Sequence, residues 1–380
     1  MMAESSDPLE GFPQSMNSTA APEYRTDVLT GLVSLIAPAR SARPSARHPE
    51  PHISRTDDPF AEGAEAETPN ESFAVRKPGT APNTPGWNLR VVPNRYPAVG
   101  PITASEPEVD KPPTISDFFP TAAARGAHEV VIECPDSRSR LADLSLVEIT
   151  QVLLAWRQRV QHLSESGEYQ SLAVFRNEGF SAGASLAHCH SQIMATQTLT
   201  PLDQQRHQIA VDYHKRTGRE LLMDLAEAEL SAGQRVIMKT LDFIVMCPFA
   251  SRGPWQVRFI PLLSAPAFFS EASDHCLSEL AGLLRQTINA LEVALEGAFS
   301  FNLILPHPRL DQPPQYRWML ELLPRIGRHA GWEYLSNVEI VTVAPEYAAE
   351  ALRGHMKQMP GINSFSEGVA PGNLPDVSLS

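Results

Sequence analysis

Apolar positions along the chain repeat with two different periods. Between Leu144 and Leu163 they recur every three or four residues, which predicts a helix with one buried face. The run from Cys276 to Leu295 has the same period, and 202–230 also has helical character. Shorter runs rich in β-branched and aromatic residues predict strands at 32–37, 87–99, 128–134, 169–177, 235–238, 243–249, 255–261, 301–306 and 317–324.

The order of these elements is the same in both halves of the chain. In each half, strands come before an amphipathic helix and further strands follow it. This order favours an α+β fold in which mostly antiparallel sheets pack on helices. The repetition implies an internal duplication, with two sheets that can pair edge to edge. We expect domains at 23–200 and 201–356, and tails at 1–22 and 357–380, where Ser, Pro and other small residues dominate.

The stretch 174–194 combines a glycine-rich turn with two histidines and a glutamine spaced by two. In an extended strand, successive side chains point to opposite faces, so His188, His190 and Gln192 would project to the same side. On a helix the same side chains would point about 200° apart from one to the next and would not converge. The spacing therefore favours a strand that presents all three groups to one ligand.

The turn before these residues has few side chains to obstruct a ligand. Gly179 and Gly183 are separated by small residues, so backbone N–H groups can approach a phosphate closely. Asn177 at the start and Ser185 at the end add side chains that form hydrogen bonds. A glycine-rich loop by itself more often only turns the chain. Its combination with His-x-His-x-Gln is what favours a phosphate site.

The full pattern, Asn-x-Gly-x-x-x-Gly-x-Ser-x-x-His-x-His-x-Gln, resembles the active-site signature of the galactose-1-phosphate uridylyltransferase branch of the histidine-triad superfamily. Relatives of the ADP-glucose phosphorylase type belong to the same branch. The resemblance covers about 24–353 and implies duplicated histidine-triad-like halves. It also implies that His190 attacks the α-phosphorus of a nucleoside diphosphate sugar, while Gln192 holds the phosphate.

The residue types suit this chemistry independently of the resemblance. An imidazole with a reference pKa near 6.5 is mostly neutral at cellular pH and keeps a lone pair for attack on phosphorus. A covalent intermediate divides one transfer into two easier displacements. Gln192 can donate to a phosphoryl oxygen without acting as a base, and such a bond contributes roughly 1.5–3 kcal/mol. The alternative is that His188 and His190 are ordinary, partly buried strand histidines.

Further ligand contacts follow from the register with the family. The resemblance implies that Arg40 and Arg43 reach the phosphates of the nucleotide sugar, a task that suits planar guanidinium groups. Asn94 and Tyr96 lie in Asn-Arg-Tyr-Pro, which is similar to the family's Asn-x-Tyr-Pro element in the nucleobase and ribose pocket. Without the resemblance, two arginines three apart are more often solvated, and Tyr96 is as readily a core residue.

The chain departs from the family at the positions that hold a structural zinc. Where relatives carry Cys-Pro-x-Cys, this chain has Asp58-Pro59-Phe60-Ala61, and the third ligand position is Ser137. Of the four family ligands only His188 is retained, and one histidine does not bind zinc tightly. We therefore predict no zinc at this site and no other cofactor, with Asp58 as a remnant that is not expected to hold metal.

The second half departs from the family as well. Relatives often have His-Trp-His where this chain has Arg317-Trp318-Met319, so we expect no second metal site. Relatives of the phosphorylase type have Gly-Thr-Gly where this chain has Leu335-Ser336-Asn337. Glycine amides that would grip a sugar phosphate are therefore replaced. Arg317 and Arg325 are the candidates that take over this phosphate contact.

Composition narrows the class of partner. The 380-residue chain carries 44 acidic and 31 basic residues, a net charge of −13, which disfavours a nucleic-acid surface. Its four cysteines form no Cys-x-x-Cys pair, so they indicate neither disulfides nor a cysteine zinc site and fit a reducing cytoplasm. We find no export leader and no apolar run approaching about 18 residues. We therefore expect a cytoplasmic protein that does not span a membrane.

The sequence thus predicts a nucleotidyltransferase that moves a UMP group from a UDP-hexose to a hexose 1-phosphate through a covalent nucleotidyl-histidine. Its partners are then a nucleotide sugar and a sugar 1-phosphate, and the resemblance adds a homodimer as a candidate assembly. Two alternatives stay open. One is an adenylyl-transferring enzyme of the ADP-glucose phosphorylase type, and the other is a degenerate family member that binds a nucleotide without turnover.

Overall fold

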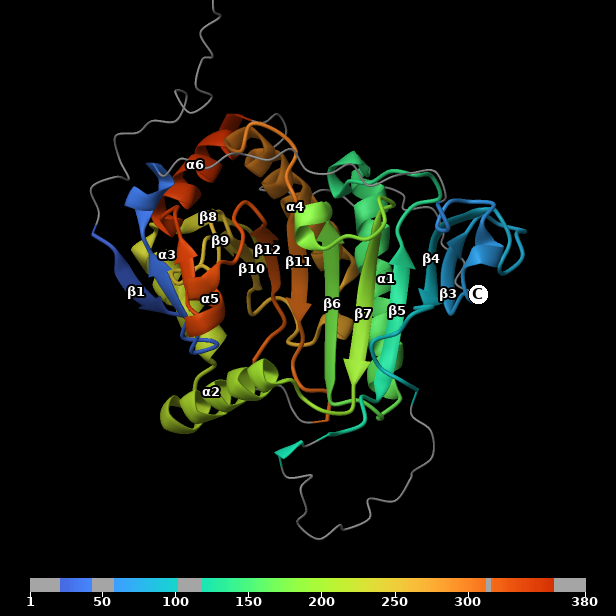
Figure 1. Ribbon diagram of the computed structural model, residues 1–380, viewed down its shortest axis with the longest axis horizontal. Helices are drawn as coiled ribbons and strands as arrows, with labels where there is room; N and C mark the ends of the chain where they lie inside the picture. Colours follow the sequence, from blue (N-terminus) through green and yellow to red (C-terminus); the bar gives the residue numbers. More distant parts are fainter. Residues whose placement is uncertain (1–20, 43–57, 102–117, 120, 312–315, 359–380) are drawn as a thin grey trace, which may run out of the picture.

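The computed structural model describes residues 21–42, 58–101, 118–119, 121–311 and 316–358 (Figure 1). Most of the two predicted tails lies outside these residues, and so does Arg43. None of the helices in the described ranges combines the length and the apolar composition that crossing a bilayer requires.

Ten strands form one continuous sheet, and each neighbouring pair is antiparallel. The strands are β3 (Phe73–Arg76), β4 (Trp87–Pro93), β5 (Gly126–Ile132), β6 (Ser171–Glu178), β7 (His190–Thr196), β8 (Val236–Lys239), β9 (Phe243–Met246), β10 (Val257–Pro261), β11 (Phe301–Pro306) and β12 (Leu320–Pro324). Their spatial order is β3-β4-β5-β7-β6-β11-β12-β10-β9-β8, as Figure 1 shows.

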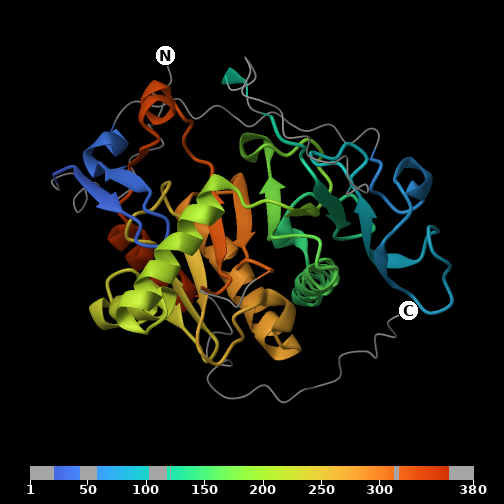
Figure 2. The same cartoon turned by 90° about the horizontal axis from the view of Figure 1, so that it is seen from below.

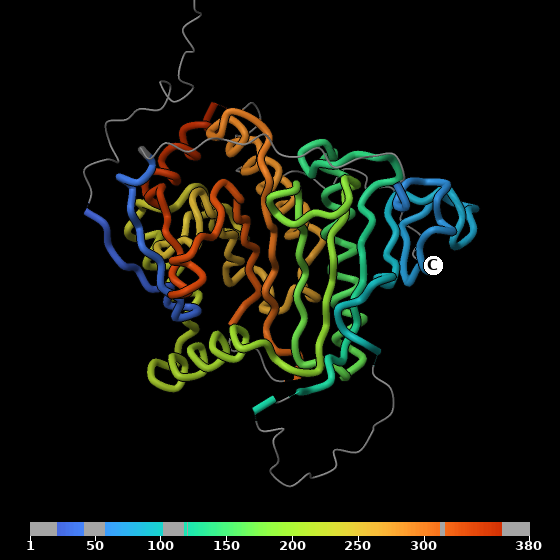
Figure 3. Tube along the Cα trace, in the orientation of Figure 1, coloured from blue at the N-terminus to red at the C-terminus, as the bar shows by residue number. Residues whose placement is uncertain are grey.

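The strand order contains the predicted duplication. From one edge it runs β3-β4-β5-β7-β6, and from the other edge β8-β9-β10-β12-β11, which is the same topology shifted by five strands. The two halves join where β6 pairs with β11, and these strands run side by side at the centre of Figure 3. The expected edge-to-edge pairing and the α+β class are confirmed. The boundaries between the two predicted domains stay a prediction, because one sheet and one core run through both.

Two long helices cover one face of this sheet. Helix α1 (Leu146–Glu165) follows β5, and α4 (Asp274–Ala294) follows β10, at equivalent positions of the two halves. Ser145 and Glu148 form a capping box that satisfies the free amides at the start of α1. The two helices pack against each other and bury one core that includes Trp156, Leu284 and residues of both halves.

The opposite face of the central strands is more open. Along β6, β7 and β11, buried residues alternate with half-buried ones, which is the period-two pattern of a sheet covered on one side. Viewed from below in Figure 2, α1 and α4 lie on one side of the sheet, and the loop between β6 and β7 lies on the other side. This face is therefore the accessible side of the central strands.

The smaller elements lie around the second half. Residues 23–36, which we placed in the first domain, form β1 (Glu23–Thr26) and β2 (Val33–Ile36). These pair with β13 (Glu339–Val341) in a separate three-stranded sheet. The stretch 202–230, predicted to be helical, forms two helices. Helix α2 (Pro201–Thr217) ends at Gly218 in the left-handed conformation, and α3 (Leu221–Ala232) follows it. Helices α5 (Gly331–Ser336) and α6 (Pro345–Gln358) complete the described chain.

Candidate active site

His190 is the first residue of β7, and its hydrogen bond defines which ring nitrogen is free. Nδ1 lies 2.8 Å from the backbone carbonyl of His188. A carbonyl oxygen can only accept, so Nδ1 carries the proton and Nε2 keeps its lone pair. The strand begins at His190 rather than at His188, so it starts two residues later than we predicted and its alternation still places His190 and Gln192 on one face.

Burial keeps this imidazole neutral. The residue is only 7% exposed, and burial lowers the pKa of His190 from its ordinary value of 6.5, with the nearby Arg176 charge acting in the same direction. The ring of Phe60 meets the ring of His190 edge-on, with the centroids 5.4 Å apart. A neutral imidazole whose orientation is fixed by a hydrogen bond, and whose Nε2 is unprotonated, has the properties of a nucleophile.

Gln192 lies on the same side of β7 and is oriented by His128 of β5. The Ala98 backbone N–H donates to Nδ1 of His128 at 3.1 Å, so that nitrogen is an acceptor and the neutral ring carries its proton on Nε2. Nε2 lies 2.8 Å from Oε1 of Gln192 and donates to it. With its oxygen engaged, Gln192 has its amide N–H groups left to donate to a ligand. Asn94 lies beside the same group, with its side-chain nitrogen 3.3 Å from Nε2 of His128. Both nitrogens are donors in this arrangement, so the contact is not a hydrogen bond.

Asn177 is positioned by the second half of the chain. Because Phe175 pairs with Gln192, Asn177 lies two residues further along β6, opposite His190. The side-chain amide of Asn302, on β11, donates to Oδ1 of Asn177 at 2.9 Å and to the carbonyl of Ala182 at 2.9 Å. The strand seam between the two halves therefore holds both the asparagine and the loop that follows it.

The glycine-rich loop differs in detail from the predicted phosphate cradle. The backbone amides of Ala182, Gly183 and Ala184 donate to carbonyls inside the loop, so they are not available to a phosphate. Gly183 has a φ of 86°, a left-handed conformation that ends the short turn Phe180–Ala182. Ser185 is exposed at the end of the loop, as a ligand contact requires.

A buried ion cluster lies behind the nucleophile. Arg176, 1% exposed, pairs with Glu133 and with Glu178 (2.9 Å). Its guanidinium also donates to the His190 carbonyl at 3.4 Å and to Cys189 Sγ at 3.4 Å. Burying a charge is costly unless it is paired, so this cluster fixes the backbone of the His-Cys-His segment.

The positions that match the family's zinc ligands hold one another by hydrogen bonds. His188 Nδ1 lies 2.8 Å from the Asp58 carboxylate, and its Nε2 lies 2.8 Å from the Cys134 carbonyl. Ser137 donates to the same Asp58 oxygen at 2.5 Å. Burial alone would raise the pKa of Asp58, but these hydrogen bonds lower it, so the carboxylate is ionised. Both ring nitrogens of His188 are directed at groups of the protein, so neither faces an open metal position. These contacts do not suit zinc, and the absence of the relatives' zinc stays a prediction.

The predicted arginines fall in different places. Arg325 directly follows β12, at the edge of the sheet where β6 ends and β7 begins, since Pro324 pairs with Phe301 and Phe301 with Glu178. Arg317 precedes β12 at the opposite edge. Its guanidinium donates hydrogen bonds to the Glu220 carboxylate at 3.1 Å and to the Ala265 carbonyl at 2.6 Å.

Arg40 and Tyr96 are both exposed, but in different parts of the molecule. Arg40 lies in the short turn Pro38–Ala42 after β2, and this segment lies beside the second half rather than beside β7 (Figure 1). Tyr96 is 81% exposed, so the alternative that it is a core residue is wrong. Its backbone N–H donates to Asn94, which lies in the Gln192 group. Leu335-Ser336-Asn337 forms the end of α5 and its left-handed cap.

Sequence reasoning missed two of the positioning side chains. His128 was noted only as the start of a strand, and Asn302 only as part of one. The available signal was a polar residue in an otherwise apolar strand, as in Phe301-Asn-Leu-Ile-Leu. Which partner each would meet depends on strand register, and no local pattern contains that information.

Comparisons with known proteins agree with this geometry. The family described as "Galactose-1-phosphate uridyl transferase, N-terminal domain" matches residues 13–200. ADP-glucose phosphorylase from Arabidopsis thaliana is 30% identical over 346 residues, covering 88% of this chain and 93% of that protein. Galactose-1-phosphate uridylyltransferase from Rattus norvegicus is 27% identical and covers 84% of each chain.

Solved structures give the same grouping. The crystal structure of the Arabidopsis thaliana ADP-glucose phosphorylase with bound ADP-glucose superimposes with a TM-score of 0.71 at 28% identity, over 88% of this chain and 99% of that one. A uridylyltransferase structure superimposes with a TM-score of 0.65 at 25% identity, over 88% and 98%. The chain therefore belongs to the galactose-1-phosphate uridylyltransferase family, together with ADP-glucose phosphorylase, and is an enzyme of the nucleotidyltransferase type.

Proposed function

We propose that this enzyme transfers a nucleotidyl group from a nucleoside diphosphate hexose to a phosphate acceptor through a covalent bond to His190. The observation that carries the proposal is the direction of one hydrogen bond. Because Nδ1 of His190 donates to the His188 carbonyl, Nε2 is left as an unprotonated nitrogen on the strand that also presents Gln192. The degenerate alternative, binding without turnover, is disfavoured because this nucleophile and its neighbours are intact.

The proposed chemistry consists of two displacements at phosphorus. In the first, the Nε2 lone pair forms a bond to the α-phosphorus, and the bond from that phosphorus to the bridging oxygen breaks. Hexose 1-phosphate leaves with the electron pair. In the second, an acceptor phosphate oxygen attacks, and the N–P bond breaks to return the pair to Nε2. Gln192 and Asn177 would donate to the oxygens on which charge increases, which is where hydrogen bonds accelerate the transfer.

The first choice of substrates is a UDP-hexose as donor and a hexose 1-phosphate as acceptor, which would place the enzyme in galactose metabolism. A second choice is ADP-glucose with inorganic phosphate. The support for this second choice is the similarity to the Arabidopsis thaliana ADP-glucose phosphorylase, which extends over 88% of this chain. Both use the same His190 chemistry and differ only in the base and the acceptor.

Intact-protein mass measurement after mixing with each nucleotide sugar tests the proposal. A uridylyl adduct with UDP-glucose supports the first choice, and an adenylyl adduct with ADP-glucose supports the second. The adduct should be lost in His190→Ala and retained in His162→Ala, which changes an exposed histidine at the end of α1. No adduct with either sugar would leave the degenerate alternative as the better account.

Arg325 is the candidate contact for the acceptor phosphate. A hydrogen bond to a charged group contributes roughly 1.5–3 kcal/mol, so Arg325→Ala should raise the acceptor KM by about 10- to 150-fold while adduct formation persists. Arg328→Ala, a change at an exposed neighbour, should leave this KM unchanged. Equal acceptor KM values in the two variants would show that Arg325 does not contact the acceptor phosphate.

A cytoplasmic location and a homodimer belong to the same proposal. The support is the reducing-compartment pattern of four unpaired cysteines and the assembly implied by the family resemblance. Light scattering coupled to size-exclusion chromatography would measure the mass of the assembly directly.

A further inference from the structure

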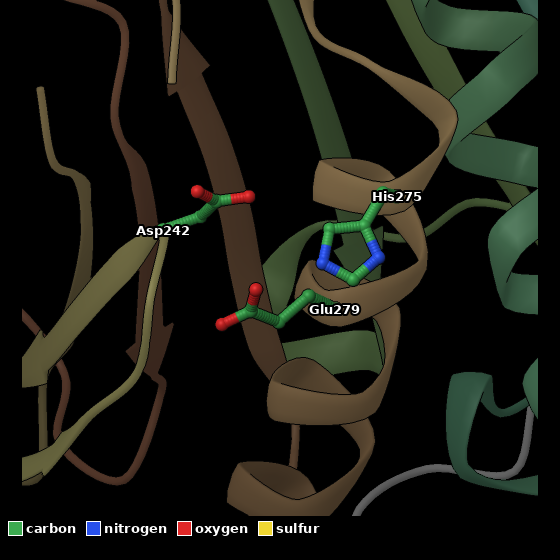
Figure 4. Close-up of side chains that lie close together, drawn as sticks. All are labelled: Asp242, His275 and Glu279. Carbon is green, nitrogen blue, oxygen red and sulfur yellow. The ribbon is translucent and has the colours of Figure 1, made fainter. Parts of the chain in front are cut away.

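A cluster of three metal-ligating side chains lies away from the site described above. Asp242 lies in the turn between β8 and β9, and His275 and Glu279 lie one turn apart near the start of α4. One ligand atom from each residue lies within 4.8 Å of the others, and Figure 4 shows the three side chains converging on one space.

The two carboxylates of this cluster are buried close to each other. Asp242 and Glu279 are each 6% exposed, and within the described residues neither forms an ion pair with lysine or arginine. The backbone amide of Asp242 and the side chain of Thr240 lie against the Glu279 carboxylate. Its Oε1 is nevertheless buried, and no group in the described part of the chain forms a hydrogen bond with it. An unpaired buried acceptor beside a second acid is unfavourable unless something positive or a proton lies between them.

From this arrangement we infer that Asp242, His275 and Glu279 form a binding site for a divalent cation. One imidazole nitrogen and two carboxylate oxygens suit Zn²⁺ or Mn²⁺ better than Mg²⁺, which prefers an all-oxygen shell with several waters. The cation would supply the missing partner of Glu279 Oε1 and cancel the charge of the acid pair. Water would complete the coordination on the side of exposed His275.

The surrounding structure fixes the positions of Asp242 and Glu279, two of the three candidate ligands. The turn that carries Asp242 is fixed by bonds from Leu262 N–H to the Asp242 carbonyl and from Ser264 to the Leu241 carbonyl. Glu279 is fixed by the core face of α4. Two ligand bonds of about 2.1 Å span at most about 4.2 Å, so donor atoms that lie within 4.8 Å of one another need at most a small side-chain movement to share a cation. His275 can make this movement because its side chain is exposed.

The consequence of binding would be structural. The site joins the β8–β9 turn to α4, two elements of the second half that lie far apart in the sequence (Figure 4). A ligand that binds only the folded state stabilises it in proportion to the logarithm of its concentration. The inference therefore does not depend on the reaction at His190.

Calorimetric titration of the EDTA-treated full-length protein with ZnCl₂ and MnCl₂ tests the site. We expect one equivalent to bind, the unfolding temperature to rise, and MgCl₂ to have a much weaker effect. Glu279→Gln and His275→Gln should each weaken binding by at least tenfold, whereas His162→Gln, a change at an exposed histidine of α1, should not.

An anomalous difference map from a zinc-soaked crystal gives a second measurement that needs no variant. A peak between Asp242 and Glu279 would support the site. A peak only at His188 or at surface histidines, or undiminished binding by the double variant Glu279→Gln/His275→Gln, would overturn it. A proton on Glu279 would then take the place of the cation, since burial raises the pKa of this carboxyl group.

Discussion

Three histidines around the candidate active site differ in what each ring nitrogen faces. His190 has one nitrogen at a carbonyl and one free, which makes it a nucleophile. His128 has one nitrogen at a backbone N–H, which makes the other a donor to Gln192. His188 has acceptors at both nitrogens, one of them the Asp58 carboxylate. The same residue type thus performs three tasks, and the direction of hydrogen bonds assigns them.

Formation of the nucleotidyl-enzyme should tolerate mild acid. Burial lowers the pKa of His190 below 6.5, so the unprotonated, reactive ring persists as the pH falls through 6.5 and is lost only below it. We expect the single-turnover rate of adduct formation to be flat from pH 8 to about 6.5 and to decline at lower pH. A rate already half lost at or above pH 6.5 would contradict this assignment.

His128 should act as a positioning residue for Gln192. His128→Phe keeps a ring of similar shape beside Phe175 but removes the donor, and one hydrogen bond contributes about 0.5–1.5 kcal/mol. We expect adduct formation to slow by about 2- to 12-fold with little change in the unfolding temperature. The double variant His128→Phe/Gln192→Ala should be no slower than Gln192→Ala alone. Additive losses would show that His128 acts elsewhere.

At the scale of elements, the site depends on how β6 and β7 are joined and on what β11 adds. The loop between β6 and β7 bonds to itself, and Asn302 of β11 holds it from the side. The antiparallel register of β6 and β7, in which Phe175 pairs with Gln192, places Asn177 and His190 at the same end of the two strands. Strand pairing therefore forms the site. The loop is fixed by its own hydrogen bonds and by Asn302, and its bonded amides are not available to a phosphate.

Gly183→Ala should cost stability and also slow the transfer. The added Cβ meets no atom within 4 Å, so the cost comes from the left-handed backbone, about 1–2 kcal/mol. Gly167 is a matched control, because it has a φ of 68° and similar open space but lies in the connection from α1 to β6. Urea unfolding should show similar losses for Gly167→Ala and Gly183→Ala, and only the second should slow adduct formation. Equal rates of adduct formation in the two variants would show that the conformation of this loop does not affect catalysis.

At the scale of the whole molecule, the two halves share one sheet and one core. The topology of five strands occurs twice, but β6 and β11 pair along their length, and α1 packs on α4. Only the first half carries the His-x-His-x-Gln segment, while the second contributes Asn302 and the edge that bears Arg325. The two duplicated halves thus form one folded unit, and they contribute different residues to the candidate active site.

We expect the two halves to unfold together. Leu303 is 1% exposed on β11 at the seam, and a buried Leu→Ala change costs about 2–5 kcal/mol. In Leu303→Ala, hydrogen exchange followed by mass spectrometry should show faster exchange in β5 and in β10 by similar factors. Loss of protection confined to β10 and its neighbours would mean that the halves are separate folding units.

The amino-acid pattern alone determined the element types, the repeated order of the two halves and the nucleophile candidate, because period, turn residues and the His-x-His-x-Gln spacing are local properties. It did not determine that 202–230 breaks into two helices, or that the residues after β2 lie beside the second half.

Tertiary structure decided which groups meet. Arg317, a candidate contact at a position where the chain departs from the family, lies at the opposite edge of the sheet from Arg325 and pairs with Glu220. His128 and Asn302 belong to no motif and reach the site through strand register. The physical reason is that contact between strands depends on pairing across long separations, and a protonation state depends on the partner that each nitrogen then faces.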